Sequence, residues 1–216
     1  ALADALRLSD EDRDLLRRAA KVADGSYTCL VHGTPPARSV RPTVRAMLDR
    51  IAAPAFVLNQ TGDLLAWTDA YERLATPLGI LETDRPNLLR YVFTDPRARV
   101  AYPEWDRVAD EQVVQFRSEA VLTEAHAAEL AGELTEAAGA AFSARLEGPP
   151  RTPLRAGVER LVHPEAGDLR LMFETLDLPA DEGQRLVVLL PGDEATATAL
   201  DRLAGRRPGA LRAVSG

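Results

Sequence analysis

Residues 157–191 read GVERLVHPEAGDLRLMFETLDLPADEGQRLVVLLP, and this stretch decides the fold class. It contains three short runs of apolar and β-branched residues separated by the turn-forming segments PEAGD and PADEGQ, a pattern that predicts three consecutive antiparallel strands. From Leu169 to Glu174 the residues alternate between two faces, as expected of a half-buried strand. The last run, residues 186–190, is apolar throughout and is therefore expected near the centre of a sheet.

Two further apolar runs, residues 55–58 and 64–67, flank the turn-forming segment QTGD and predict a β-hairpin. Residues 55–58 are apolar on both faces, so this strand is expected beside residues 186–190. A hairpin, a helical insertion and a three-stranded meander together predict an α+β fold. We expect a PAS-like five-stranded antiparallel sheet in the order 2-1-5-4-3, with helices on one face and a short helical segment before it.

The insertion between the hairpin and the meander is predicted to be helical. Residues 87–108, NLLRYVFTDPRARVAYPEWDRV, are divided by two prolines, and Asp95 before the first of them is typical of a helix start. Apolar residues then recur at helical spacing over residues 108–121. A second such pattern predicts one helix over residues 127–146, which ends before a proline-rich loop.

The sequence divides into four segments by composition. Residues 1–25 are predicted to be helical, residues 26–41 form a linker, residues 42–204 form the sheet domain and residues 205–216 form a flexible tail. The chain starts at Ala1 rather than at a methionine, and we expect it to be the latter part of a longer protein.

Composition limits the classes of function. The chain has 216 residues and a formal net charge of −7, which argues against a nucleic-acid coat because phosphate binding needs a concentrated positive surface. Apolar runs are shorter than the roughly 18 residues of a membrane-spanning helix, and no signal peptide is evident, so we expect a cytoplasmic protein without membrane contact. The single cysteine, Cys29, cannot form an internal disulfide.

Catalytic and metal-binding patterns are missing from the sequence. Residues 87–108 contain no Ser, Cys or His that could pair as nucleophile and base. Cys29 and His32 form a C-x-x-H fragment without partners, and His126 lacks the second histidine of an HExxH helix. His163, before a proline, is expected in a turn or at the surface. We therefore predict no catalytic residues, no metal and no enzyme.

The arginines of residues 87–108 allow a nucleic-acid surface to be considered, with aromatic rings as stacking platforms. Acidic residues are interspersed among them, so the local charge is nearly balanced. We favour an ion-paired, solvated helix face. The arginines are Arg90, Arg97, Arg99 and Arg107, and the acidic residues are Asp95, Glu104, Asp106 and Asp110.

Four blocks in a fixed order resemble the ligand-binding domain of the MmyB-like transcription regulators. They are residues 54–67, 87–120, 131–137 and 158–195. The chain departs from the family pattern at Thr68, where asparagine is usual, and at residues 145–147, where the family has a Leu-Trp and His pattern.

The resemblance implies a bacterial, cytoplasmic, DNA-binding regulator that joins a Cro/C1-type helix-turn-helix domain to a PAS-like sensor. Residues 1–25 would then be the tail of a helix-turn-helix domain that is missing here, and DNA would be bound only through that domain. The resemblance further implies a homodimer and a small apolar ligand of the fatty-acid-like class, with no other cofactor.

Aromatic and apolar residues on the helices and the sheet are candidates for the walls of such a ligand pocket. The periodicity allows either a pocket or a filled core. If the core is filled, the domain would be a dimerisation or interaction module without a ligand. The pocket candidates are Phe56, Trp67, Tyr91, Phe93, Phe116, Phe142, Leu171, Phe173 and Val188. Arg97 and Arg117 are candidates for binding a ligand carboxylate.

Overall fold

The computed structural model describes residues 38–119, 125–178, 183–207 and 209–214. The helix expected over residues 1–25, most of the linker, Cys29 and His32 lie outside the described residues.

The sheet has five strands in the order β2-β1-β5-β4-β3, and every neighbouring pair is antiparallel. This order confirms the predicted α+β fold, and it places the two all-apolar strands side by side at the centre. The strands are β1 Ala55–Leu58, β2 Leu64–Trp67, β3 Ala156–His163, β4 Gly167–Asp177 and β5 Arg185–Pro191.

Helices α4, α5, α6 and α10 begin at residues with side chains that accept backbone hydrogen bonds. Asn87 caps α5, Asp95 caps α6 and Asp193 caps α10, which confirms Asp95 as a helix start. The helices are α3 Pro42–Leu48, α4 Asp69–Ala75, α5 Leu88–Thr94, α6 Pro96–Ala101, α7 Trp105–Glu119, α8 Ala125–Ala138, α9 Ala140–Leu146 and α10 Glu194–Leu203.

The prediction of one continuous helix over residues 127–146 is wrong. Gly139 has a φ of +56°, a backbone conformation that glycine adopts without steric cost, and it divides the segment into α8 and α9. The apolar spacing continues across this break, which is why the pattern alone did not reveal it.

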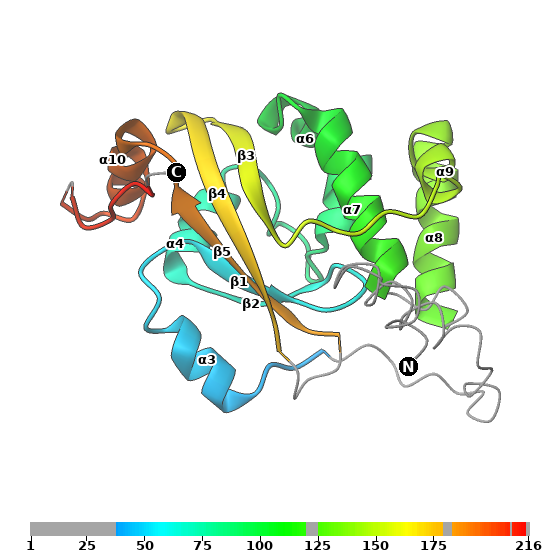
Figure 1. The fold of residues 1–216 in the computed structure, drawn as a ribbon, viewed down its shortest axis with the longest axis horizontal. Helices are drawn as coiled ribbons and strands as arrows, with labels where there is room; N and C mark the ends of the chain where they lie inside the picture. The colour runs from blue at the N-terminus through cyan, green and yellow to red at the C-terminus, as the bar shows by residue number, and fades with distance from the viewer. Residues whose placement is uncertain (1–37, 120–124, 179–182, 208, 215–216) are drawn as a thin grey trace, which may run out of the picture. The chain divides into compact units, whose positions relative to one another are not determined.

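Helices cover the two faces of the sheet unequally (Figure 1). The main helical layer packs on one face, where buried residues of α4 to α7 join those of the sheet. A second apolar cluster, with Phe142 and Leu134, lies among α5, α7, α8 and α9. Helix α3 packs on the opposite face, where Val44 and Leu48 cover β1 and the start of β5. The central strands are thus covered on both sides.

Thr68 ties the hairpin to α4. Its hydroxyl accepts hydrogen bonds from the amides of Ala55 (3.0 Å) and Tyr71 (3.2 Å) and donates one to the carbonyl of Ala53 (3.1 Å). We expect Thr68→Val to lower the free energy of unfolding by about 1–3 kcal/mol, because it keeps the shape but leaves buried partners unpaired. Urea denaturation measures this loss. Thr68→Ser retains the hydroxyl and serves as the control, and equal losses in both variants would contradict the assignment.

Candidate functional site

A cavity of about 130 Å³ lies between the sheet and the main helical layer. Its walls come from β1, β3, β4 and β5 on one side and from α4, α5 and α7 on the other. We call it the central cavity, and its apolar walls include Phe56, Leu74, Val92, Leu161, Leu171 and Leu189. Strand register explains the sheet side, since Phe56 stands opposite Val187 and Leu189 stands opposite Phe173.

Three of the nine pocket candidates line the central cavity, namely Phe56, Leu171 and Phe173. Val188 lies on the opposite face of the sheet, in the cluster under α3, while its neighbour Val187 lines the cavity. Trp67 borders a separate, more polar depression beside α8.

The other aromatic candidates pack within the helical layer. The Tyr91 hydroxyl donates a hydrogen bond to the Leu78 carbonyl at 2.9 Å. Phe93 packs edge-on against Trp105 and Phe142, with ring centres 5.8 and 5.1 Å apart. Phe116 and Phe142 belong to the cluster among α5, α7, α8 and α9. These rings hold the helices that form the cavity wall.

The two arginines considered for a ligand carboxylate are both engaged away from the central cavity. Arg97 forms ion pairs of 2.7 Å with Glu82 and Asp95. Arg117 donates to the carbonyl of Gly148 at 2.6 Å, in the loop after α9.

The ion-paired interpretation of residues 87–108 is confirmed. Arg90 makes two 2.7 Å hydrogen bonds to Glu133 on α8, and Arg107 makes one of 2.7 Å to Glu104. The guanidinium carbon of Arg99 lies 3.6 Å from the centre of the Trp105 ring. These arginines therefore join elements of the domain to one another.

Several polar residues on the cavity wall were not among the candidates. Three of them, Tyr71 on α4, Tyr102 after α6 and Glu159 on β3, we call the polar wall. The other polar lining residues are Arg107, Glu111, Gln112, Gln115, Thr175 and Arg185. Glu159 faces inward because it stands opposite Leu171 in the β3–β4 register. The sequence indicates this orientation, because Glu159 lies two residues before the apolar Leu161 and alternate residues of a strand share a face.

Burial changes the ionisation of the polar wall. Removal from water raises the pKa of the Glu159 carboxyl to about 7, and Arg107 opposes this rise while Glu104 adds to it. Burial and the charge of Glu159 also raise the pKa of the hydroxyls of Tyr71 and Tyr102. The electrostatic effect of Glu159 on both hydroxyls indicates that the three groups share one part of the cavity.

His163 is buried, with only 1% of its surface exposed, so its expected surface position is wrong. Its role in a turn is confirmed, because Nδ1 accepts hydrogen bonds from the amides of Glu165 and Ala166, both at 3.1 Å. Nε2 therefore carries the proton and donates to the Leu74 carbonyl at 3.1 Å. The ring ties β3 to α4, which forms part of the cavity wall.

Within the described ranges, no three His, Cys, Asp or Glu side chains are grouped as a metal ion would require. None of the described helices combines the length and apolar character needed to cross a membrane.

A family model for the MmyB-like transcription regulator ligand binding domain matches residues 40–203, which include the sheet and the central cavity. The chain belongs to this family. The match confirms the resemblance of the four sequence blocks. MmyB-like ligand-binding domains are parts of transcription regulators and not enzymes, so the prediction of no enzyme is also confirmed. No curated protein matches the chain.

Proposed function

We propose that the central cavity binds a small, mainly hydrocarbon ligand of the fatty-acid-like class, and that the domain acts as the sensor of a cytoplasmic bacterial regulator. The observation that supports this best is an apolar cavity between a sheet and packed helices, the usual setting of a ligand site. We further propose that the intact regulator is a homodimer and that another of its domains binds DNA.

The size of the cavity limits the ligand. An apolar cavity of roughly 150 Å³ holds benzene, so about 130 Å³ accommodates a group of about six carbons. At roughly 0.8 kcal/mol per methylene, burying such a chain contributes about 5 kcal/mol before the entropic cost of binding. A longer chain requires the helices to move apart, and this requirement links ligand length to helix position.

The alternative is an interaction module without a ligand. It is supported by the apolar side chains Val158 and Leu176, which are 36% and 49% exposed on the outer face of β3 and β4. The two functions are compatible, because this surface and the central cavity lie on opposite faces of the sheet. We propose that the exposed surface contributes to the homodimer.

Regulation requires that the ligand bind two arrangements of the domain with different affinity. Helices α4, α5 and α7 contribute both to the cavity wall and to the helical layer, so they are the elements that a ligand would displace. We propose that their displacement carries the signal to the rest of the regulator.

Neighbouring residues of β5 provide a matched test of the site. Val187 lines the cavity and Val188 faces the other side, and both are half-buried. We expect Val187→Phe to weaken binding of 1-octanol about tenfold, because the ring displaces roughly two ligand methylenes. Val188→Phe should leave the affinity unchanged. Calorimetric titration of both variants and the parent chain measures the difference.

Equal effects of the two substitutions would place the ligand outside the central cavity. Native mass spectrometry of the chain purified from cells adds an independent observation. A retained mass of a hydrocarbon ligand supports the sensor function, and failure both to retain a ligand and to bind 1-octanol would favour the interaction module.

A further inference from the structure

The polar wall of the central cavity indicates which end group the ligand carries. This inference rests on the proposed function, because it concerns the same cavity. We infer that the ligand, within the fatty-acid-like class, is the amine or alcohol and not the acid itself, because it presents a hydrogen-bond donor, as a protonated amine or a hydroxyl, to the Glu159 carboxylate.

Glu159 has the position of a ligand-binding group. It lies on β3 with its side chain on the inner face, in the same row as Leu171 and two residues from the buried Leu161. It borders the cavity and therefore keeps part of its surface accessible. In the part of the chain that the structure describes, its carboxyl group makes no hydrogen bond or ion pair. A carboxyl in an apolar cavity without a partner is costly unless a ligand pairs with it.

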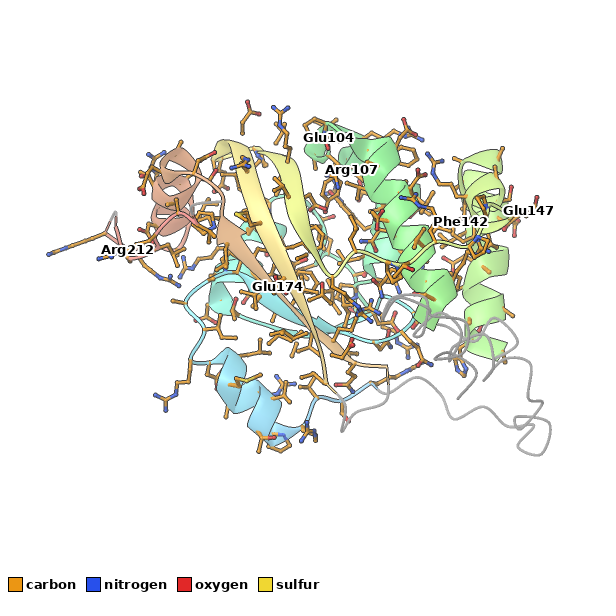
Figure 2. The ribbon with its side chains drawn as sticks, in the orientation of Figure 1. Glu104, Arg107, Phe142, Glu147, Glu174 and Arg212 are labelled. Atoms are coloured by element: carbon orange, nitrogen blue, oxygen red, sulfur yellow. The ribbon has the colours of Figure 1, made fainter. Side chains whose placement is uncertain are left out.

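The nearest cation is already engaged. Arg107 on α7 donates through Nε to Glu104 at 2.7 Å and through a terminal nitrogen to the carbonyl of Val158 at 3.1 Å. Figure 2 shows Arg107 and Glu104 together where α7 approaches β3. The charges of Glu104 and Arg107 offset each other, so this pair does not neutralise Glu159 when it is ionised.

The two tyrosines complete the site. Tyr71 and Tyr102 are 3% and 7% exposed and line the cavity. Neither hydroxyl makes a hydrogen bond to another described residue. A phenolic oxygen can accept a hydrogen bond from an amine or alcohol and can donate one to a carboxylate. With Glu159 they offer several acceptors on the wall of the cavity, which suits an ammonium group or a hydroxyl.

An anionic end group meets the opposite situation. A ligand carboxylate beside Glu159 would bring two negative charges together in a site of low dielectric, where like charges repel strongly. Arg185 also lines the cavity, but far from Glu159. Glu159 pairs with Leu171, which pairs with Pro191 on β5. Arg185 lies six residues before Pro191, a distance of about 20 Å along the strand. A fatty acid would therefore have to bind with its carboxylate at the Arg185 end.

Ligands of one length and three end groups distinguish these arrangements. We would titrate the full 216-residue chain at pH 8 with hexylamine, 1-hexanol and hexanoate, and follow binding by NMR chemical-shift changes. We expect hexylamine to bind at least about tenfold more tightly than hexanoate, with 1-hexanol between them. If hexanoate binds as tightly as hexylamine, the inference is overturned, and the result indicates that a ligand carboxylate binds near Arg185.

Glu159→Gln removes the charge with little change of shape. The affinity for hexylamine should fall about tenfold, and the affinity for 1-hexanol should fall less than about threefold. Glu174→Gln, the same change on the outer face of β4, is the control and should alter neither affinity. An unchanged hexylamine affinity in Glu159→Gln would overturn the inference.

The parent chain offers a second measurement that needs no variant. Since the pKa of Glu159 is about 7, lowering the pH from 8 to 6 neutralises this carboxyl while hexylamine, like lysine with a pKa of about 10.4, stays protonated. The groups that face Glu159 are Arg107, Glu104, Tyr71 and Tyr102, and the resolved pKa shifts of the tyrosines are upward, away from this range. Hexylamine affinity should fall severalfold and 1-hexanol affinity should not.

The four compounds distinguish a failure of the proposed sensor function from a failure of this inference alone. If none of the three compounds binds and 1-octanol also fails, the proposed sensor function fails and this inference fails with it. If 1-octanol and hexanoate bind but hexylamine does not, only the inference fails.

Discussion

Replacing Phe142 with alanine is expected to lower the free energy of unfolding by about 3–5 kcal/mol, the usual cost of removing a buried phenylalanine ring. The ring has no exposed surface, and it contacts Phe93 edge-on with centres 5.1 Å apart. It lies where α9 turns back onto α5, α7 and α8, so the loss should reach all four helices. Urea denaturation followed by circular dichroism measures the change.

Phe142→Leu is the matched control, since it keeps most of the apolar volume and should cost less than about 2 kcal/mol. Because Phe142 lies outside the central cavity, we expect this folded variant to bind 1-octanol with the affinity of the parent chain. A large loss of affinity in Phe142→Leu would show that the cavity extends into the second cluster.

Replacing His163 with alanine is expected to cost about 2–4 kcal/mol at pH 8. The change leaves the carbonyl of Leu74 and the amides of Glu165 and Ala166 without their partner, and it creates a void where the ring was. This cost is comparable with that of a core substitution, although the residue is polar.

The cost of His163→Ala should also depend on pH. Burial lowers the pKa of His163 in the folded state from its ordinary value near 6.5. The neutral ring therefore contributes its full stability above about pH 6.5, and that contribution is lost as the pH falls through the lower folded pKa. The difference between the parent chain and the variant should shrink from pH 8 to pH 5.

Comparison with the variant isolates His163 from other groups. Glu159 has a raised pKa, so its effect on the free energy of unfolding depends on pH in the opposite direction. Its stabilising contribution is lost as the pH rises from about 4.5 to about 7. This contribution is present in both proteins, so it cancels in the difference between their free energies of unfolding. A difference that stays constant with pH, or grows as the pH falls, would contradict the proton assignment of His163.

The sequence predicted the sheet well because each strand carried a local signal. The turns QTGD, PEAGD and PADEGQ marked the strand ends, and the absence of polar residues in 55–58 and 186–190 identified the two central strands. Helix boundaries were predicted where a cap was present, as at Asp95. The break at Gly139 was not predicted, since a single glycine inside a helical pattern is compatible with either outcome.

The cavity was harder to predict for two physical reasons. An all-apolar strand has no alternation, so nothing local distinguishes Val187, which lines the cavity, from Val188, which does not. The aromatic residues of 87–108 are also equally suited to a wall or to the packing behind it. Tyr91 and Phe93 turned out to lie in that packing.

The unequal covering of the sheet has a consequence for how the domain opens. Strands β1 and β5 are covered by α3 on one face and by the main helical layer on the other, whereas β3 is an edge strand with Val158 exposed. Local opening should therefore require less free energy at β3 than at the centre of the sheet. Glu159 lies on that edge strand, so we expect a ligand of the central cavity to enter or leave where β3 opens, while the middle of the sheet keeps its hydrogen bonds.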